Sequence, residues 1–266
     1  MDQISKKLEK WREIINNGRE EHLPRKEYLF DQSFKLKKVI DECIVGENKK
    51  KPRRTYLGGS SLGEECARRI QYRFMGTESD HDKEFSARTL RIFEFGHIIE
   101  DQMALWLRQS GFDLRTENKQ GKQFGFSIAD DQIKGHIDGV ICSGPEAAGL
   151  QYPMLWECKS ANDRKFKEFV RDGMARTNPV YAAQVALYQA YMDLTEHPAL
   201  FTVINKNTSD IYYELVEFDK SLAQKISDRA VDIIKAVESS TMMPRIAHNN
   251  DYFTCKMCEF HMTCWQ

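Results

Sequence analysis

Apolar residues recur at two different spacings along the chain. In residues 4–15, and again in residues 85–109, they follow the period of an amphipathic helix. Another helix is predicted to begin at Ser61, because Ser61 and Glu64 form a capping-box pattern ahead of an apolar run. The chain up to residue 109 is therefore predicted to be mostly helical.

After residue 109 the apolar runs become short, rich in β-forming residues and separated by Gly, Pro and Asp. This pattern predicts strands at 124–129, 133–142 and 154–159, a helix at 179–194, a hairpin of strands at 201–205 and 211–218, and a last amphipathic helix at 222–237. Strands that alternate with helices are typical of an α/β sheet flanked by helices. We expect that architecture here.

Composition and charge narrow the class of protein. Hydrophobic residues make up 41% of the 266, enough to build a core, and the formal net charge of −1 excludes a globally basic nucleic-acid binder. No run reaches the ~18 apolar residues of a membrane helix, and the amino terminus lacks a signal-peptide core. We therefore expect a cytoplasmic protein without a membrane partner. A run of cations at 49–54 separates two predicted domains, a charged helical extension at 1–55 and a larger domain at 56–266.

Charged residues interrupt two of the predicted strands. Glu157 and Lys159 share a face, because side chains alternate along a strand, and Asp138 lies on the preceding strand. Charged groups among Ile, Val, Leu and Trp are costly to bury unless they bind something. Two carboxylates beside a lysine suit Mg²⁺ or Mn²⁺, with the ammonium orienting a water. A salt bridge between Glu157 and Lys159 is the alternative that the pattern leaves open.

Two predicted helices bring further polar groups. Glu100 lies among apolar neighbours in the middle of a helix, one turn after His97. A buried carboxylate there needs a partner, and a metal ion is one candidate. On a later helix Gln184 and Tyr188 share a face, four residues apart, where ordinary core packing is the alternative.

Three of the seven cysteines fall within ten residues of each other near the end of the chain, at Cys255, Cys258 and Cys264. In a chain of this length and cysteine content, such a cluster favours metal over disulfides. Three thiolates are one ligand short of a tetrahedral or cubane site. The fourth ligand is either His261, in the same loop, or Cys66, far upstream.

Taken together, these polar motifs resemble those of the PD-(D/E)xK nucleases and, within them, the RecB-like branch. In the family's order, Gly96–Glu100 is similar to its G-x-x-x-E helix, Asp138 to its strand aspartate, Glu157–Lys159 to its E-x-K and Gln184–Tyr188 to its Q-x-x-x-Y helix. The resemblance implies a restriction-endonuclease-like core, with a central mixed sheet flanked by helices. An N-terminal helical extension and a C-terminal cysteine cluster would lie outside that core.

The resemblance also implies roles for these residues. Metal ligands would be Glu100, Asp138, Glu157 and the backbone carbonyl of Cys158. Lys159 would position or deprotonate the attacking water, while Gln184 and Tyr188 would line the site. Many RecB-like enzymes carry a histidine on the first helix, which makes His97 a second candidate there.

The cysteine spacing is similar to that of the iron–sulfur RecB-like nucleases, which include the CRISPR adaptation nuclease family and the AddB-type helicase–nuclease subunit. One cysteine of these proteins precedes the nuclease core and three follow it. The similarity implies a structural [4Fe–4S] cluster on Cys66, Cys255, Cys258 and Cys264. A zinc site of the three tail cysteines and His261 is the alternative.

The expected activity is that of a Mg²⁺- or Mn²⁺-dependent deoxyribonuclease, a single-strand-preferring exonuclease of recombination, repair, phage replication or CRISPR adaptation. Its expected partners are DNA with single strands or free ends, and recombination or CRISPR integration proteins. The alternatives are a DNA-end-binding or partner-binding module of such a complex, and a zinc-stabilised endonuclease. Three basic stretches, at 49–54, 68–74 and 164–171, are candidates for phosphate contacts, with a linker, core packing and a solvated helix face as their alternatives.

Overall fold

The computed structural model describes residues 3–17, 26–80 and 83–266, and the chain divides into two compact units. The first unit contains Met1–Lys51 and Phe85–Leu90, and the second contains Pro52–Glu84 and Arg91–Gln266. Residues 1–2, 18–25 and 81–82, most of which fall in the expected extension, lie outside the described residues.

The first unit is helical, as the spacing of its apolar residues predicted. It contains α1 (Gln3–Asn17), α2 (Lys26–Lys50) and the first turn of α4 (Ala87–Gln109). Along α2, Lys37 and Asp41 pair one turn apart at 2.6 Å, an arrangement that stabilises a helix by about 0.2–0.5 kcal/mol. Pairs of this kind help a strongly charged segment to stay helical.

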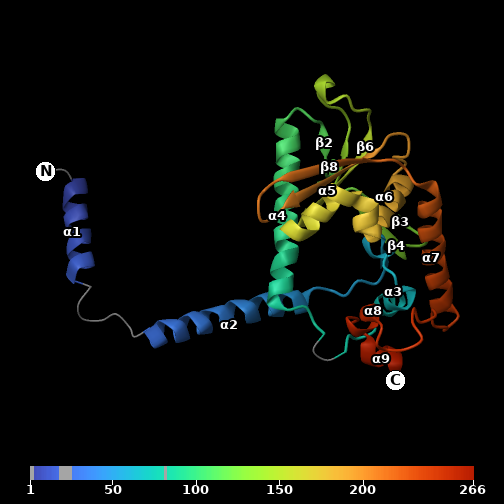
Figure 1. Ribbon diagram of the computed structural model, residues 1–266, viewed down its shortest axis with the longest axis horizontal. Helices are drawn as coiled ribbons and strands as arrows, with labels where there is room; N and C mark the ends of the chain where they lie inside the picture. Colours follow the sequence, from blue (N-terminus) through green and yellow to red (C-terminus); the bar gives the residue numbers. More distant parts are fainter. Residues whose placement is uncertain (1–2, 18–25, 81–82) are drawn as a thin grey trace. The chain divides into compact units, whose positions relative to one another are not determined.

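The second unit is built on a mixed sheet of five strands, in the order β2–β5–β6–β7–β8. Figure 1 labels three of them, β2, β6 and β8. The five strands are β2 (Leu114–Arg115), β5 (Gly139–Ile141), β6 (Met154–Ala161), β7 (Ala199–Asn205) and β8 (Ile211–Val216). β6 and β7 pair in parallel, whereas the other neighbours are antiparallel. The crossover between the parallel strands runs through α5 (Asp163–Thr177) and α6 (Pro179–Tyr191). The expected α/β architecture with a mixed sheet is confirmed.

A smaller sheet has three strands in the order β1–β4–β3. They are β1 (Leu57–Gly58), β4 (Ile133–His136) and β3 (Gly125–Ile128). β1 runs parallel to β4, with Gly58 opposite Lys134, and β3 runs antiparallel to it.

The prediction of one strand at 133–142 is wrong, because the chain passes from the small sheet to the large one within that stretch. Two residues, Ile137 and Asp138, form the joint between β4 and β5. The Ile137 N–H donates to the carbonyl of Phe124 at 3.0 Å, and Asp138 Oδ2 accepts from the N–H of Cys158 at 2.7 Å. One residue of the joint is thus bonded beside the small sheet and the other to β6 of the large sheet.

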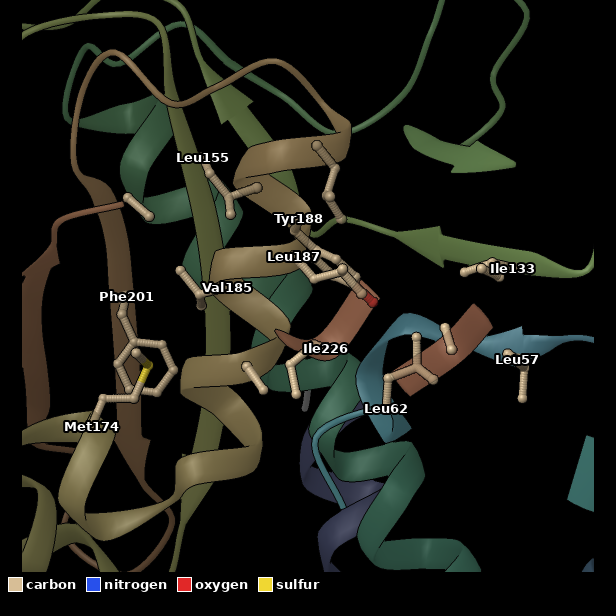
Figure 2. Close-up of a cluster of buried hydrophobic side chains, with 14 of the residues drawn as sticks. Leu57, Leu62, Ile133, Leu155, Met174, Val185, Leu187, Tyr188, Phe201 and Ile226 are labelled. Carbon is tan, nitrogen blue, oxygen red and sulfur yellow. The ribbon is translucent and has the colours of Figure 1, made fainter. Parts of the chain in front are cut away.

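Helices cover both faces of the five-stranded sheet. On one face Leu155 and Phe201 pack with Val185 of α6 and Ile226 of α7 (Lys220–Glu238), as part of the cluster in Figure 2. On the other face Met103 and Leu107 of α4 pack with Trp156, Cys158 and Leu200. The predicted alternation along 154–159 is therefore confirmed, since Trp156 and Cys158 point away from Leu155.

The predicted helix start at Ser61 is wrong. Ser61 ends a 3₁₀ turn, and α3 runs from Ala67 to Phe74 with Cys66 as its N-cap. The turn stays apart from the helix because the chain at Gly63 lies against α6, where a Cβ would come within 2.6 Å of Ala183. Two short helices, α8 (Phe253–Lys256) and α9 (His261–Trp265), complete the chain.

None of the helices in the described part of the chain combines the length and the apolar character that crossing a bilayer requires.

Candidate active site and cysteine pocket

Glu157 lies at the centre of the candidate site and is completely buried. Its Oε1 atom accepts hydrogen bonds from Lys159 Nζ and, at 2.6 Å, from Gln184 Nε2. Its Oε2 atom is buried without a hydrogen-bond partner. Burial, and next the nearby Asp138, raise the pKa of Glu157 to about 8. A carboxylate oxygen buried without a partner is costly, and a bound cation would satisfy it.

Asp138 and Glu100 complete a group of three interacting carboxylates. Asp138 is held by the N–H of Cys158, and Glu100 projects from α4. Burial is the largest cause that raises the pKa of each, and Asp138 also raises the pKa of Glu100, which reaches about 7. Glu100 in turn raises the pKa of Glu157. The structure therefore brings together the three carboxylates that the sequence singled out, as groups that repel each other when ionised.

Lys159 is the cation of this group. Burial by itself lowers the pKa of Lys159, but Glu157 and Asp138 outweigh burial and raise it above the ordinary lysine value. The ammonium also lies 5.3 Å from the centroid of the Tyr181 ring. In this environment Lys159 keeps its proton. It is therefore suited to orient a water or stabilise negative charge, rather than to act as a base.

The two polar residues of α6 and the histidine of α4 take different positions. Gln184 donates to Glu157, whereas Tyr188 is almost fully buried and packs its ring edge-on to Phe126 at 5.7 Å. The His97 side chain is exposed, with Nδ1 at 3.8 Å from Glu100 Oε2. Gln184 therefore belongs to the inner site, Tyr188 joins the site to the core, and His97 lies at the rim.

These residues surround a cleft of about 510 Å³ within the second unit. Its lining includes Glu100, Asp138, His97, Gln184 and Tyr188, together with Arg54, Tyr56, Arg108, Lys134 and His136. The buried Glu157 and its partner Lys159 are not part of this lining. Considering only described residues, no group of three or more His, Cys, Asp or Glu side chains is set to hold a metal ion. The carboxylates are thus gathered without forming a finished coordination sphere.

The sequence reasoning gave no site role to Tyr56, Arg108 or Lys134. Arg54 belonged to a cationic run for which phosphate contacts and a linker were the two alternatives, and nothing placed it beside the carboxylates. Arg54 lies near Lys134 because β1 pairs with β4, and this pairing cannot be predicted from local sequence spacing.

The four cysteines of the predicted cluster line one small pocket, here called the cysteine pocket, together with Tyr72, His261 and Trp265. The backbone N–H groups of Arg69 and Phe260 donate to the sulfurs of Cys66 and Cys258, each at 3.4 Å. The side chains of Tyr72 and Trp265 line the same pocket as Cys255 and Cys264. Two of the four sulfurs, those of Cys66 and Cys258, therefore accept backbone hydrogen bonds.

The thiols of the pocket influence one another electrostatically. Burial raises the pKa of Cys66, Cys255 and Cys258, and neighbouring thiols raise each of these pKa values further. In the protein without metal, the thiols of these three residues are therefore protonated at neutral pH. His261 turns its Nδ1 atom to the carbonyl oxygen of Cys255, at 2.9 Å.

The basic stretch at 68–74 makes protein contacts beside this pocket. Arg69 and Arg73 each pair with both Glu64 and Glu259, with N–O distances of 2.5–3.4 Å. The Tyr72 ring lies 5.1 Å from that of Phe260. These contacts join α3 to the C-terminal segment, so they favour the packing alternative over phosphate contacts.

The basic stretch at 164–171 lies on α5, where its cations pair locally. Lys165 contacts Glu168 at 3.0 Å, Lys167 contacts Asp163 at 2.8 Å, and Arg171 contacts its neighbour Asp172. This is the expected arrangement of a solvated helix face.

No protein-family model and no curated protein matches the chain. Among solved structures, it is similar to the alkaline exonuclease LHK-Exo from Laribacter hongkongensis, with a TM-score of 0.50 and 13% identity over 71% of this chain and 90% of that one. The same exonuclease in complex with dAMP matches at a TM-score of 0.50 and 14% identity, with the same coverage. The crystal structure of SSO0001 matches at a TM-score of 0.46 and 16% identity, over 86% of this chain and 96% of that one. At these identities the likeness is one of fold alone: the chain has a nuclease-like fold, similar to that of the alkaline exonuclease.

Proposed function

We propose that this protein is a Mg²⁺- or Mn²⁺-dependent deoxyribonuclease of the PD-(D/E)xK, RecB-like type. The observation that carries the proposal is Glu157, buried with one oxygen bonded to Lys159 and Gln184 and the other without a partner, beside two further carboxylates. A structural salt bridge needs one carboxylate for one lysine. Three carboxylates around one ammonium leave an excess of negative charge that suits a divalent cation.

The donor set fits such a cation. Glu100, Asp138 and Glu157 offer carboxylate oxygens, the ligands that hard divalent ions prefer, and the carbonyl of Cys158 is the fourth proposed ligand. When bound, the metal would activate a water and neutralise charge on the scissile phosphate. Lys159 would hold the attacking water and offset negative charge through its ammonium. Gln184 fixes the Glu157 carboxylate, and His97 is a further candidate at the rim.

The preferred substrate in this proposal is single-stranded DNA with a free end, cut as by an exonuclease. Three facts support this finer statement. The fold is like that of an alkaline exonuclease, and that exonuclease has been solved with dAMP bound. The cleft is also lined by cations next to the carboxylates, as a phosphodiester substrate requires.

Asp138→Asn tests this activity, because it keeps an oxygen for the Cys158 N–H while removing the charge. Purified protein and variant would be compared on linear and circular single-stranded DNA of one sequence, with Mn²⁺ and with EDTA. We expect Mn²⁺-dependent loss of the linear form only, and a fall in rate of at least about 100-fold in the variant. Asp113→Asn, in an exposed pair with Arg115, is the matched control. Equal cleavage by Asp138→Asn would refute the site, and equal loss of both DNA forms would show an endonuclease.

We further propose that Cys66, Cys255, Cys258 and Cys264 hold a structural [4Fe–4S] cluster. The thiolate donor set fits it, and four sulfurs that surround a common pocket suit a cluster better than a single zinc ion, whose ligands must converge on one point. His261 also lines the pocket, and because its Nδ1 atom lies 2.9 Å from a backbone carbonyl, its Nε2 atom is the one that the alternative zinc site would use. Measuring the iron and zinc content of protein purified without oxygen distinguishes the [4Fe–4S] cluster from the zinc site. We expect iron and a broad visible absorption. One zinc and no iron would establish the alternative.

A further inference from the structure

The cleft has a wall to which the proposed chemistry assigns no role. Glu100 comes from α4 and Asp138 from the β4–β5 joint, whereas Tyr56, Gly58 and Lys134 come from the small sheet and its approach. Gly58 and Lys134 are register partners on β1 and β4. This wall carries positive charge within the same cleft that holds the carboxylates.

Arg54 is held in a defined place on this wall. Its guanidinium lies 5.2 Å from the centroid of the Tyr56 ring, and Lys134 Nζ lies 5.6 Å from the same centroid. The absence of a side chain at Gly58 makes room for it, because a Cβ at that position would lie 2.5 Å from Arg54 Nη1. The guanidinium therefore lies between the Tyr56 ring and the backbone of Gly58, and this position is here called the seat of Arg54.

Arg54 also differs from the other cations of the cleft in its partners. Lys134 pairs with Asp131 at 3.0 Å, and Arg108 donates to the carbonyl of Leu114 and the hydroxyl of Thr116. In the part of the chain that the structure describes, no acidic side chain pairs with Arg54. A guanidinium that is positioned but has no protein anion suits an anionic ligand, and its fork of donors matches a phosphate group.

We infer that Arg54, seated on Tyr56 and Gly58, binds a backbone phosphate of the nucleic-acid strand that occupies the cleft. The inference rests on the proposed nuclease function, since it takes a phosphodiester as the ligand. Tyr56 acts as a positioning residue that fixes the guanidinium. Gly58 keeps the seat open.

Gly58 provides a second way to remove the contact without removing the charge. Its backbone angles, φ −78° and ψ 126°, are ordinary for alanine. A methyl group there meets the far end of the Arg54 side chain, which can swing away, and otherwise only Ser61 Oγ at 3.7 Å. Gly58→Ala should therefore fold normally and displace the guanidinium, so its effect and that of Arg54→Ala should not add.

The test measures binding of a fluorescently labelled single-stranded oligonucleotide to the full chain by anisotropy, in EDTA so that no cleavage occurs. Arg54→Ala should weaken binding by about tenfold and reduce the slope of log K against log salt by about 1. Gly58→Ala should produce a similar loss, and the double variant no further loss. Arg53→Ala is the matched control, because Arg53 pairs with Glu78 and does not line the cleft.

Unchanged binding by Arg54→Ala overturns the inference, as does an equal loss in Arg53→Ala, which would indicate only a general effect of charge. Additive losses in the double variant would show that Gly58 acts by another route and would overturn the proposed seat. Metal-dependent cleavage by the unmodified protein is scored separately. If that protein binds DNA through Arg54 but never cleaves it, the proposed function fails and the phosphate contact remains.

Discussion

The carboxylate site and the cysteine pocket are both proposed metal sites, but the fold supports them differently. Asp138, Glu157 and Lys159 lie on or beside β6, held by a sheet whose core exists without them. The cysteine pocket joins Cys66 to residues near the end of the chain, and these two distant segments meet mainly through side-chain contacts such as the pairs of Glu259 with Arg69 and Arg73. A divalent cation in the carboxylate site would make the site catalytically active, whereas an iron–sulfur cluster in the cysteine pocket would stabilise the fold.

The largest effect expected from this contrast is a loss of activity without a loss of fold. Lys159→Ala should lower Mn²⁺-dependent cleavage by at least about 100-fold, because the water and the phosphate lose their cation. The fold should persist, because Glu157 can take up a proton, its pKa being already raised to about 8. Cleavage rates and circular dichroism would be measured together. Lys167→Ala, on the exposed face of α5, should change neither.

In the cysteine pocket, a substitution is expected to lower the stability of the fold. Cys258→Ser should remove the visible absorption and most of the iron, and lower the melting temperature by roughly 5–10 °C, because the two distant segments lose their tie. Cys43→Ser is the control, since Cys43 is exposed on α2 in the other unit. An unchanged melting temperature in Cys258→Ser would remove the contrast between the two regions.

A smaller effect should follow from loosening the contacts beside the pocket while leaving its sulfurs intact. Glu259→Gln weakens the partly buried pairs with Arg69 and Arg73 and should cost about 1–3 kcal/mol of unfolding free energy in urea. Its cleavage rate at low denaturant should match that of the unmodified protein. Arg171→Ala, which removes an exposed pair, should cost less than about 0.5 kcal/mol.

The smallest effect concerns Asp80, whose carboxylate accepts hydrogen bonds from the N–H groups of Met262 and Thr263 at 2.6 and 3.2 Å. Asp80→Ala should lower the free energy of unfolding by about 1 kcal/mol, as the loss of a helix-capping carboxylate does. Iron content should stay the same. A collapse of iron content would mean that Asp80 helps to form the pocket as well as steadying α9.

Much of the large sheet could be predicted from the chain, because its strands are short apolar runs with clear turns between them. The joint at Ile137 and Asp138 could not, since residues 133–142 read locally as one strand and only pairing with different partners divides them. Likewise, Ser61 carries a good capping pattern, but tertiary packing at Gly63 keeps the turn apart from α3.

For the candidate site, the sequence identified groups that do come together, namely Glu100, Asp138, Glu157, Lys159 and Gln184. Their catalytic roles stay predictions. The stretch at 68–74 was a candidate for phosphate contacts because the acidic partner of Arg69, Glu259, is about 190 residues away and cannot be found from local spacing. For the same reason Arg54, whose seat is built from Tyr56 and Gly58, could not be distinguished from a linker cation.

The joint between β4 and β5 has a mechanical consequence. Of its two residues, Ile137 is bonded beside the small sheet and Asp138 is bonded to Cys158 of β6, next to Glu157. A tilt of the small sheet about this joint would move the wall that carries Gly58 and Lys134, while Asp138 stays with the large sheet. The width offered to a nucleic-acid strand can therefore change without changing the spacing of Asp138 and Glu157.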